Sequence, residues 1–374
     1  MSDLQQVLEV SLQRAEQSLY KSFLDNPSVA EQIEYVCRCL RNRAGTRLLM
    51  ACMLAKMDRP DIDPRKPYTE IGTPDSFSGR SYDEGYISHF INLHRLPCNS
   101  TTAFLTPAFR NINRPLTTDM IIIGRPRRLY VETLQLLEDV HNQQVTADDL
   151  LTEIIRLLLI MRNEKEDRMQ ALLRGLGQSE DALPLSSEQI ILLIEQHLNC
   201  KNSSRLPVLI IVAAYQAAGV KFGERVLPLH RHTAADEQTG ALGDIEVCLT
   251  NDDRIVTAYE MKMKRVTLDD VDRALHKIAL AESKLHNYIF VTTETIDEHV
   301  RNYANEAYAR TGGIEIAILN CSGFLRHFLH LFHRVRLNFL NAYQELVLIE
   351  PDSAVSQPLK EAFLALRQAA EADT

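Results

Sequence analysis

Apolar residues recur every three or four positions over several long stretches of the chain, a spacing that predicts amphipathic helices. In residues 1–58 this spacing is seen at Val7, Val10, Ala15 and Leu19. Residues 150–160 are mostly leucine and isoleucine, and they predict a helix within 131–200. The alanine-rich stretch 362–372 predicts a surface helix and a frayed terminus. The pattern therefore indicates a helix-rich chain.

A different pattern occupies residues 204–319, where short apolar strands alternate with helices. The spacing predicts a helix over about 204–218, a strand-turn-strand hairpin over 243–265 and strands over 288–293 and 314–319. Thr267 and Asp270 resemble a capping box, which predicts that another helix begins here. The order helix, hairpin, helix, strand, helix, strand predicts an α/β (mixed α+β) fold: a mixed β-sheet with helices on both faces.

Prolines and glycines interrupt residues 59–130, so this segment is predicted to be loop-rich, with short helices such as 86–94. It keeps aromatic residues and arginines throughout, which favours an ordered loop region over a disordered one. Residues 186–189 predict the cap of a helix in the next segment, 131–200.

Charge is distributed unevenly along the chain. The formal net charge is −9, which argues against a general nucleic-acid coat protein. Residues 95–130 nevertheless carry six arginines against the single acid Asp119, and residues 326–336 carry arginines and histidines without an acid. A hydrophobic content of 45% excludes a disordered chain. No apolar stretch predicts a signal peptide or a membrane span, and seven cysteines without a CxxC motif predict reduced thiols.

The hairpin over 243–265 carries the chemistry. Asp244 lies at its start, and Glu260 and Lys262 lie at its end. Carboxylates bind a hard divalent cation. Such a cation polarises a phosphate and generates a hydroxide nucleophile, and a lysine stabilises the negative charge of the transition state. The three residues therefore predict metal-dependent phosphodiester hydrolysis.

The geometry of this hairpin depends on its turn. Side chains alternate along a strand, so Glu260 and Lys262 share one face. A turn of two or four residues centred on 252–253 pairs Asp244 with Met261 and places it on the wrong face. A turn of three or five residues, or a bulge near Asp244, places it beside Glu260 or Lys262. We expect the irregular arrangement.

Several runs of the chain resemble the SacI family of type II restriction endonucleases, within the PD-(D/E)xK nuclease superfamily. The runs are residues 240–246 (GALGDIE), 258–262 (AYEMK), 324–334 (FLRHFLHLFHR), 65–72 (RKPYTEIG) and 101–108 (TTAFLTPA). The resemblance extends roughly from residue 15 to residue 370. The D…ExK element is common to the superfamily, whereas the other runs are more specific.

The resemblance implies Mg2+-dependent cleavage of double-stranded DNA at a short site by a cytoplasmic homodimer, with a cognate DNA methyltransferase in the same system. It implies that Asp244 and Glu260 are metal ligands and that Lys262 is the catalytic lysine; Lys264 is a competing position. A fourth acid of the superfamily, on the helix before the hairpin, has no clear equivalent. Gln216, Glu195 and Glu224 are the substitutes that remain open.

DNA contacts are expected in the loop-rich region, where Arg80 is a candidate for reading a guanine edge unless it pairs with Asp83 or Glu84. The full set of predicted contacts is Arg65, Lys66, Arg80, Arg110, Arg114, Arg127, Arg128 and His232. The predicted regions are an N-terminal helical region (1–58), a loop-rich DNA-recognition region (59–130), a helical region (131–200), the nuclease core (201–335) and C-terminal helices (336–374).

Two other functions remain open on the sequence. One is a repair or structure-specific nuclease of the same fold, and the other is a DNA-binding protein without turnover. The intact set of Asp244, Glu260 and Lys262 argues against the second of these.

Overall fold

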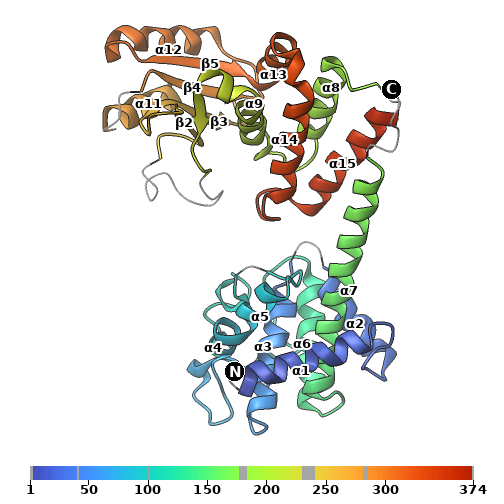
Figure 1. Cartoon of the computed structure of the whole chain (residues 1–374). Coiled ribbons are helices and arrows are strands. Elements are labelled where there is room, and N and C mark those ends of the chain that lie inside the picture. The colour runs from blue at the N-terminus through green and yellow to red at the C-terminus, as the bar shows by residue number, and fades with distance from the viewer. Residues whose placement is uncertain are drawn as a thin grey trace. The chain divides into compact units, whose positions relative to one another are not determined.

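A computed structural model describes residues 3–39, 42–99, 101–176, 183–229, 241–280 and 285–372. The chain forms two compact units, Met1–Arg168 and Met169–Thr374 (Figure 1). The boundary between them falls within a long helix, α7 (Ala147–Arg174). All seven cysteines lie within the described residues, and none of them forms a disulfide. The division into five regions stays a prediction.

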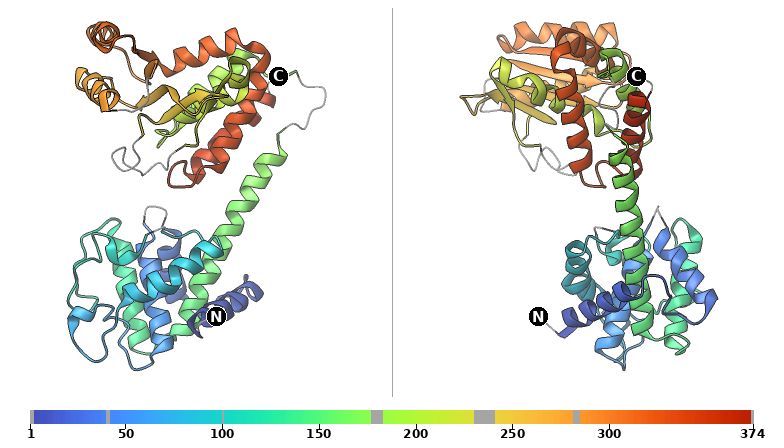
Figure 2. Two further views of the ribbon diagram at one scale, coloured as in Figure 1. Left: turned by 60° about the vertical axis from the view of Figure 1, so that its left-hand side comes forward. Right: turned by 45° about the vertical axis from the view of Figure 1, so that its right-hand side comes forward.

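The first unit is built from helices, as the apolar spacing predicts. Its longer helices are α1 (Asp3–Gln17), α2 (Pro27–Arg38), α3 (Ala44–Asp58), α6 (Arg127–His141) and the first part of α7 (Figure 2). Helix α3 is buried along residues 44–55, so the other helices pack around it. An all-round apolar helix is stable only when it is enclosed in this way.

Short elements fill the loop-rich segment of this unit, among them α4 (Gly79–Tyr82) and α5 (Ser88–Leu93). A buried ion pair fixes them to α3: Arg47 Nε donates to Asp83 at 2.6 Å, and Thr102 donates to the other Asp83 oxygen at 2.5 Å. The Arg47 and Asp83 side chains are 2% and 0% exposed. Breaking one partner of such a pair leaves an uncompensated buried charge, so this contact holds the loops in place.

The second unit contains a mixed sheet, which confirms the predicted fold class. Within the described residues its order is β1-β2-β3-β4-β5. The strands are β1 (Glu224–Val226), β2 (Ile245–Leu249), β3 (Ile255–Lys262), β4 (Asn287–Thr292) and β5 (Glu315–Asn320). The first three are antiparallel, and β3, β4 and β5 are parallel. The apolar pattern did not indicate β1, because three residues are too few to show a period.

Helices cover both faces of this sheet (Figure 1). One face shares a hydrophobic core with α8 (Ser187–Leu198), α9 (Leu206–Phe222), α13 (Cys321–Leu331), α14 (Arg336–Ile349) and α15 (Gln357–Ala372). The other packs on α11 (Leu268–Leu280) and α12 (Glu298–Thr311). The predicted capping box of α8 is present at Ser186 and Gln189. Among the described residues, no helix is both long and apolar enough to cross a lipid bilayer.

Candidate active site

The side chains of strand β3 alternate between the two faces of the sheet. Tyr259 is buried in the core under α9 and α13. Ala258 is buried in the core under α11, and Glu260 contacts Lys277 of that helix. Successive side chains on a strand point to opposite faces, so Glu260 and Lys262 belong to the α11 face. The alternation predicted from the ExK spacing is therefore present.

A register shift between β2 and β3 sets the position of Asp244. Ile245 pairs with Tyr259 and Val247 with Thr257, but Cys248 pairs with Ile255, so β3 contains one extra residue. The shift gives the irregular arrangement that we expected, although the bulge lies within the strands and not beside Asp244. Continuing the register past Ile245 sets Asp244 opposite Glu260.

Two close contacts hold the Asp244 end of β2 against β3. The Asp244 carboxylate accepts a hydrogen bond of 2.7 Å from the backbone amide of Met261. The neighbouring Gly243 is buried, and a Cβ atom there would lie 2.5 Å from the carbonyl oxygen of Tyr259. Only glycine permits such an approach between two backbones. The exposed carboxylate of Asp244 is thereby held at the backbone of Met261, the residue between Glu260 and Lys262 in the sequence.

Glu260 lies at the centre of a charged cluster. Lys262 donates to its Oε1 at 3.0 Å, and the buried Tyr288 hydroxyl donates to its Oε2 at 3.3 Å. Lys277 of α11 forms an ion pair with Oε2 at 3.6 Å. Lys264, the competing position for the lysine, is exposed and lies beyond the end of β3. The contact with Glu260 therefore belongs to Lys262.

Asp270 completes this cluster, and the sequence indicated it only as a capping residue. Its carboxylate accepts hydrogen bonds from the backbone amide and the hydroxyl of Thr267, at 2.9 and 2.8 Å, which confirms the capping box. It also lies 3.3 Å from Lys262 Nζ and 2.5 Å from Arg273. In the sequence, the feature that could have identified Asp270 as a site residue is its position in the first turn of the helix that follows the ExK strand.

The pKa values of this cluster follow from its contacts. Burial disfavours the charge on Lys262, but the carboxylates of Glu260 and Asp270 outweigh burial and raise the lysine pKa above its ordinary value. Burial likewise opposes the charge on Asp270. Its hydrogen bonds from Thr267 and Arg273, and the charge of Lys262, nevertheless lower its pKa to about 2. Both groups are therefore charged at neutral pH.

The donor set of Asp244 and Glu260 fits a hard divalent cation. Mg2+ is bound through one or two carboxylates together with water and phosphate oxygens, and the two carboxylates where β2 begins and β3 ends meet that requirement. No set of three or more His, Cys, Asp or Glu side chains within the described part of the chain is arranged to hold a metal ion. A bound cation would therefore complete its coordination with water and substrate.

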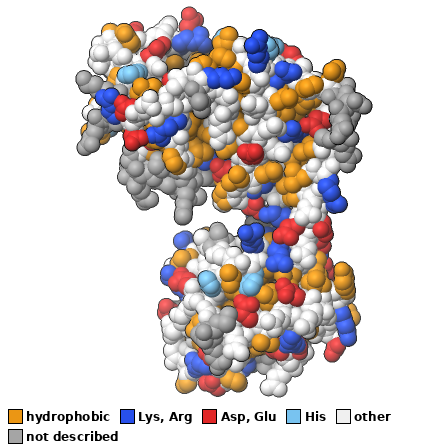
Figure 3. Space-filling model, in the orientation of Figure 1, with side chains coloured by type: hydrophobic (Ala, Val, Ile, Leu, Met, Phe, Trp, Pro, Cys, Tyr) orange, Lys and Arg blue, Asp and Glu red, His pale blue; other side chains and the backbone are white. Residues whose placement is uncertain are grey.

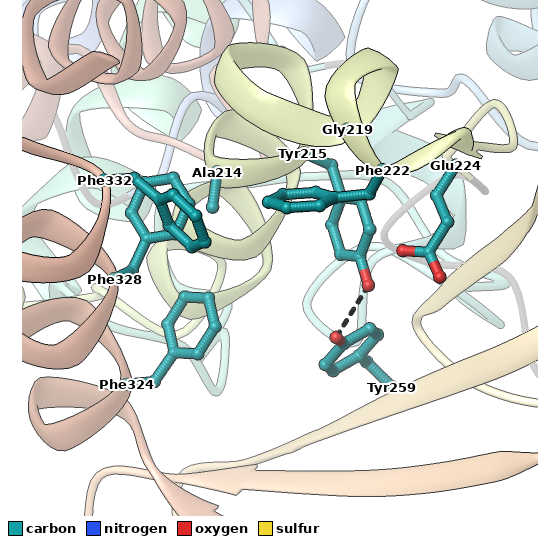
Figure 4. A pocket seen from close by; sticks show the side chains of 9 residues that line it. All are labelled: Ala214, Tyr215, Gly219, Phe222, Glu224, Tyr259, Phe324, Phe328 and Phe332. Carbon is teal, nitrogen blue, oxygen red and sulfur yellow. Dashed lines mark hydrogen bonds between the residues drawn. The ribbon is translucent and has the colours of Figure 1, made fainter. Parts of the chain in front are cut away.

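The substitutes for the fourth acid lie elsewhere. Glu224 lines a pocket together with Tyr215 and Tyr259, whose hydroxyls are 2.9 Å apart (Figure 4). Tyr259 belongs to the sheet face opposite Glu260, so Glu224 does too. Gln216 is exposed on α9, and Glu195 lies on α8. Asp270 is the additional acid that the described residues bring next to Lys262.

Half of the predicted DNA contacts have carboxylate partners within the first unit. Arg65 binds Asp63 at 2.9 Å and Glu138 at 3.0 Å, with its side chain 16% exposed. The remaining pairs are Lys66 with Asp75 at 2.7 Å, Arg80 with Glu84 at 2.7 Å, and Arg128 with Glu132 at 3.0 Å. The pairing of Arg80 is one of the two that the sequence left open, since Asp83 binds Arg47 instead.

Arg110, Arg114 and Arg127 are exposed. The charge of Arg114 acts on Asp119, while Arg110 and Arg127 have no ion-pair partner among the described residues. His232 lies outside the described residues. On the face shown in Figure 3, basic and acidic side chains are interspersed and do not form one continuous basic stripe. As DNA contacts, all eight residues stay predictions.

Residues 326–336 begin within α13, where charged side chains form ion pairs and apolar side chains are buried. Arg326 and His330 both bind Glu188 of α8 at 2.7 Å. Phe328 and Leu329 are buried between them in the core of the second unit. These two apolar residues therefore serve packing, while the charged residues of the same helix pair with α8.

Comparison with known families identifies the region that holds this cluster. Residues 184–294 match the family model of the SacI restriction endonuclease C-terminal domain. The match includes Asp244, Glu260, Lys262 and Asp270, and it confirms the SacI-family resemblance. A domain of this kind is part of a nuclease that acts on DNA. No curated protein matches the chain.

Proposed function

We propose that this chain, whose residues 184–294 belong to the SacI restriction endonuclease C-terminal domain family, is a type II restriction endonuclease that hydrolyses both strands of DNA at a specific site. The observation that carries the proposal is the register shift between β2 and β3. It sets Asp244 opposite Glu260 and leaves Lys262 on the Glu260 face. These are the groups that metal-dependent phosphodiester hydrolysis requires.

In this proposal Asp244 and Glu260 hold Mg2+, which supplies Lewis acidity and an activated water when bound. Lys262 places its ammonium beside the scissile phosphate and stabilises the negative charge that develops there. Asp270 is a positioning residue, because its contact of 3.3 Å holds Lys262 charged and in place. Tyr288 orients the Glu260 carboxylate from the core side.

The first unit is the proposed source of sequence recognition. Its exposed Arg110, Arg114 and Arg127 are available to phosphates and base edges. A palindromic site requires two copies of the chain related by a two-fold axis, so the active form is a homodimer. A cytoplasmic location and a methyltransferase that protects the host's own sites complete the system.

Digestion of a large unmethylated DNA tests this function. The purified protein is incubated with the DNA and Mg2+, beside an EDTA control and the Asp244→Ala and Glu260→Ala variants. We expect discrete bands that disappear in all three controls, and end sequencing then gives the site.

Three other outcomes of this digestion would support an alternative function or contradict the proposed site. A smear that is lost in the controls would indicate a structure-specific or repair nuclease of this fold. A gel shift without cutting in Mg2+ or Mn2+ would indicate a binding protein. Normal cutting by Asp244→Ala would contradict the proposed site.

A further inference from the structure

Glu260 is contacted by lysines from two different elements. Lys262, two residues along the same strand, donates to Oε1 at 3.0 Å. Lys277, on α11, lies 3.6 Å from Oε2. Tyr288 donates to that same Oε2 at 3.3 Å. Both oxygens of the carboxylate are therefore engaged by groups that a metal ion would have to displace or tolerate.

The two lysines are not equivalent. Lys262 also lies 3.3 Å from Asp270, a residue only 9% exposed, so a second carboxylate holds it in place. Lys277 lies seven residues after Asp270, which sets both on one face of α11 about two turns apart. Its contact of 3.6 Å with Glu260 is longer than a hydrogen bond, whereas Lys262 donates to the same carboxylate at 3.0 Å. Of the two lysine contacts with Glu260, the one made by Lys277 is therefore the weaker.

Competition for Glu260 follows from charge. A divalent cation on this carboxylate would lie within a few ångströms of two ammonium groups in a partly buried site, where repulsion between like charges is strong. DNA changes this balance, because a phosphate carries a negative charge that pairs with lysine and also supplies an oxygen ligand to the metal.

We propose that Lys277 is a counter-ion of Glu260 that keeps the metal affinity of the DNA-free protein low and transfers to a DNA phosphate when DNA binds. Metal loading then depends on DNA binding. The inference rests on the proposed function, since it takes Glu260 as a metal ligand. It assigns Lys277 a positioning and regulatory role separate from that of Lys262.

The direct test is Mn2+ binding to the DNA-free full-length chain, followed by the EPR signal of free Mn2+. We expect Lys277→Met to bind Mn2+ at least about tenfold more tightly than the unmodified protein, because one repelling charge is removed. Lys277→Gln should show the same tightening, and Lys277→Arg, which keeps the charge, should not. Arg254→Met is the matched control, since Arg254 pairs with Asp252 in the hairpin turn of the same unit.

The outcomes separate this inference from the proposed function. Equal or weaker Mn2+ binding by both Lys277→Met and Lys277→Gln, with binding still abolished by Glu260→Ala, would overturn the inference and leave the metal site intact. The same tightening in Arg254→Met would also overturn it, because the effect would then be one of net charge. Mn2+ binding that survives Glu260→Ala would reject the proposed site itself.

DNA affinity in EDTA tests the transfer step. Without metal, Lys277→Met should bind DNA several-fold more weakly, with a salt dependence reduced by about one phosphate contact. Unchanged DNA affinity and salt dependence would overturn the transfer to phosphate.

Discussion

At the residue scale, the charges around Glu260 compensate one another. Lys262 lies between the carboxylates of Glu260 and Asp270, and Asp270 is in turn held by Thr267 and Arg273. Partly buried charges persist only when they are paired. The arrangement keeps a lysine charged and fixed at the place where phosphate hydrolysis needs a positive charge.

Replacing Lys262 tests this role. We expect Lys262→Ala to retain site-specific DNA binding and to lose about 10²–10³-fold or more in single-turnover cleavage, because the transition state loses its positive partner. Binding is measured by gel shift in Ca2+, and cleavage in Mg2+. Lys264→Ala is the matched control, since Lys264 is exposed beyond the end of β3. An equal loss in both variants, or no loss in Lys262→Ala, would contradict the assignment.

At the element scale, the hairpin of β2 and β3 builds the site through its irregularity. Because β3 contains one extra residue, Asp244 lies opposite Glu260 and not opposite Met261. Gly243 permits the close backbone approach that keeps it there. A shift of one residue reverses the face of every side chain that follows, so this register is decisive for the chemistry.

Gly243→Ala tests the register. Because the new Cβ would meet the backbone of Tyr259 at 2.5 Å, β2 has to move away from β3. We expect a loss of about 1–3 kcal/mol in the free energy of unfolding and a loss of DNA cleavage. Gly323→Ala in α13 is the control, because its Cβ would have an ordinary contact of 3.8 Å with Asn320. A fully active, equally stable Gly243→Ala protein would show that the close approach is dispensable.

The packing of α8 on α14 and α15 predicts a pH dependence. His197 is fully buried, and its two ring nitrogens lie 3.0 Å from the Tyr343 hydroxyl and 3.0 Å from the Leu359 carbonyl. Burial lowers its pKa to about 4, although the hydrogen bond to Leu359 acts in the opposite direction. The neutral ring is therefore the form that the fold accepts.

The direction of the pH dependence of stability follows from the lowered pKa of His197. Above pH 6.5 the ring is neutral in both the folded and unfolded chains. As the pH falls from 6.5 towards 4, only the unfolded chain binds the proton, so the protein is destabilised by up to about 3 kcal/mol. Denaturant unfolding of the unmodified protein and His197→Gln at pH 7.5 and 5 measures the difference. Parallel pH dependences in the two proteins would contradict the prediction.

At the scale of the whole molecule, the chain divides into two units, and only the second contains the family match and the charged cluster. The net charge of −9 means that DNA affinity has to come from local positive charge. In the first unit most of the predicted contacts are paired with carboxylates, whereas Arg110 and Arg127 are exposed without such a partner among the described residues.

This division predicts that binding and cutting separate by mutation. Arg110→Ala and Arg127→Ala should each weaken DNA binding and reduce the salt slope by about one. The cleavage rate on saturating DNA should not change, because neither residue touches the reacting phosphate. Arg38→Ala, which removes an arginine paired with Glu34 and Glu164, is the control. Equal weakening by Arg38→Ala would indicate a general effect of charge.

The sequence by itself determined the order of elements apart from β1, the shared face of Glu260 and Lys262, and the capping role of Asp270, because these depend on periods of two and 3.6 residues and on neighbours along the chain. Tertiary structure alone decided the level of Asp244, the contacts of Asp270 and Lys277 with the ExK pair, and the position of Glu224 on the opposite face. It also decided which arginines are paired. The physical reason is that strand register and helix docking bring together residues far apart in sequence, and no local pattern encodes that choice.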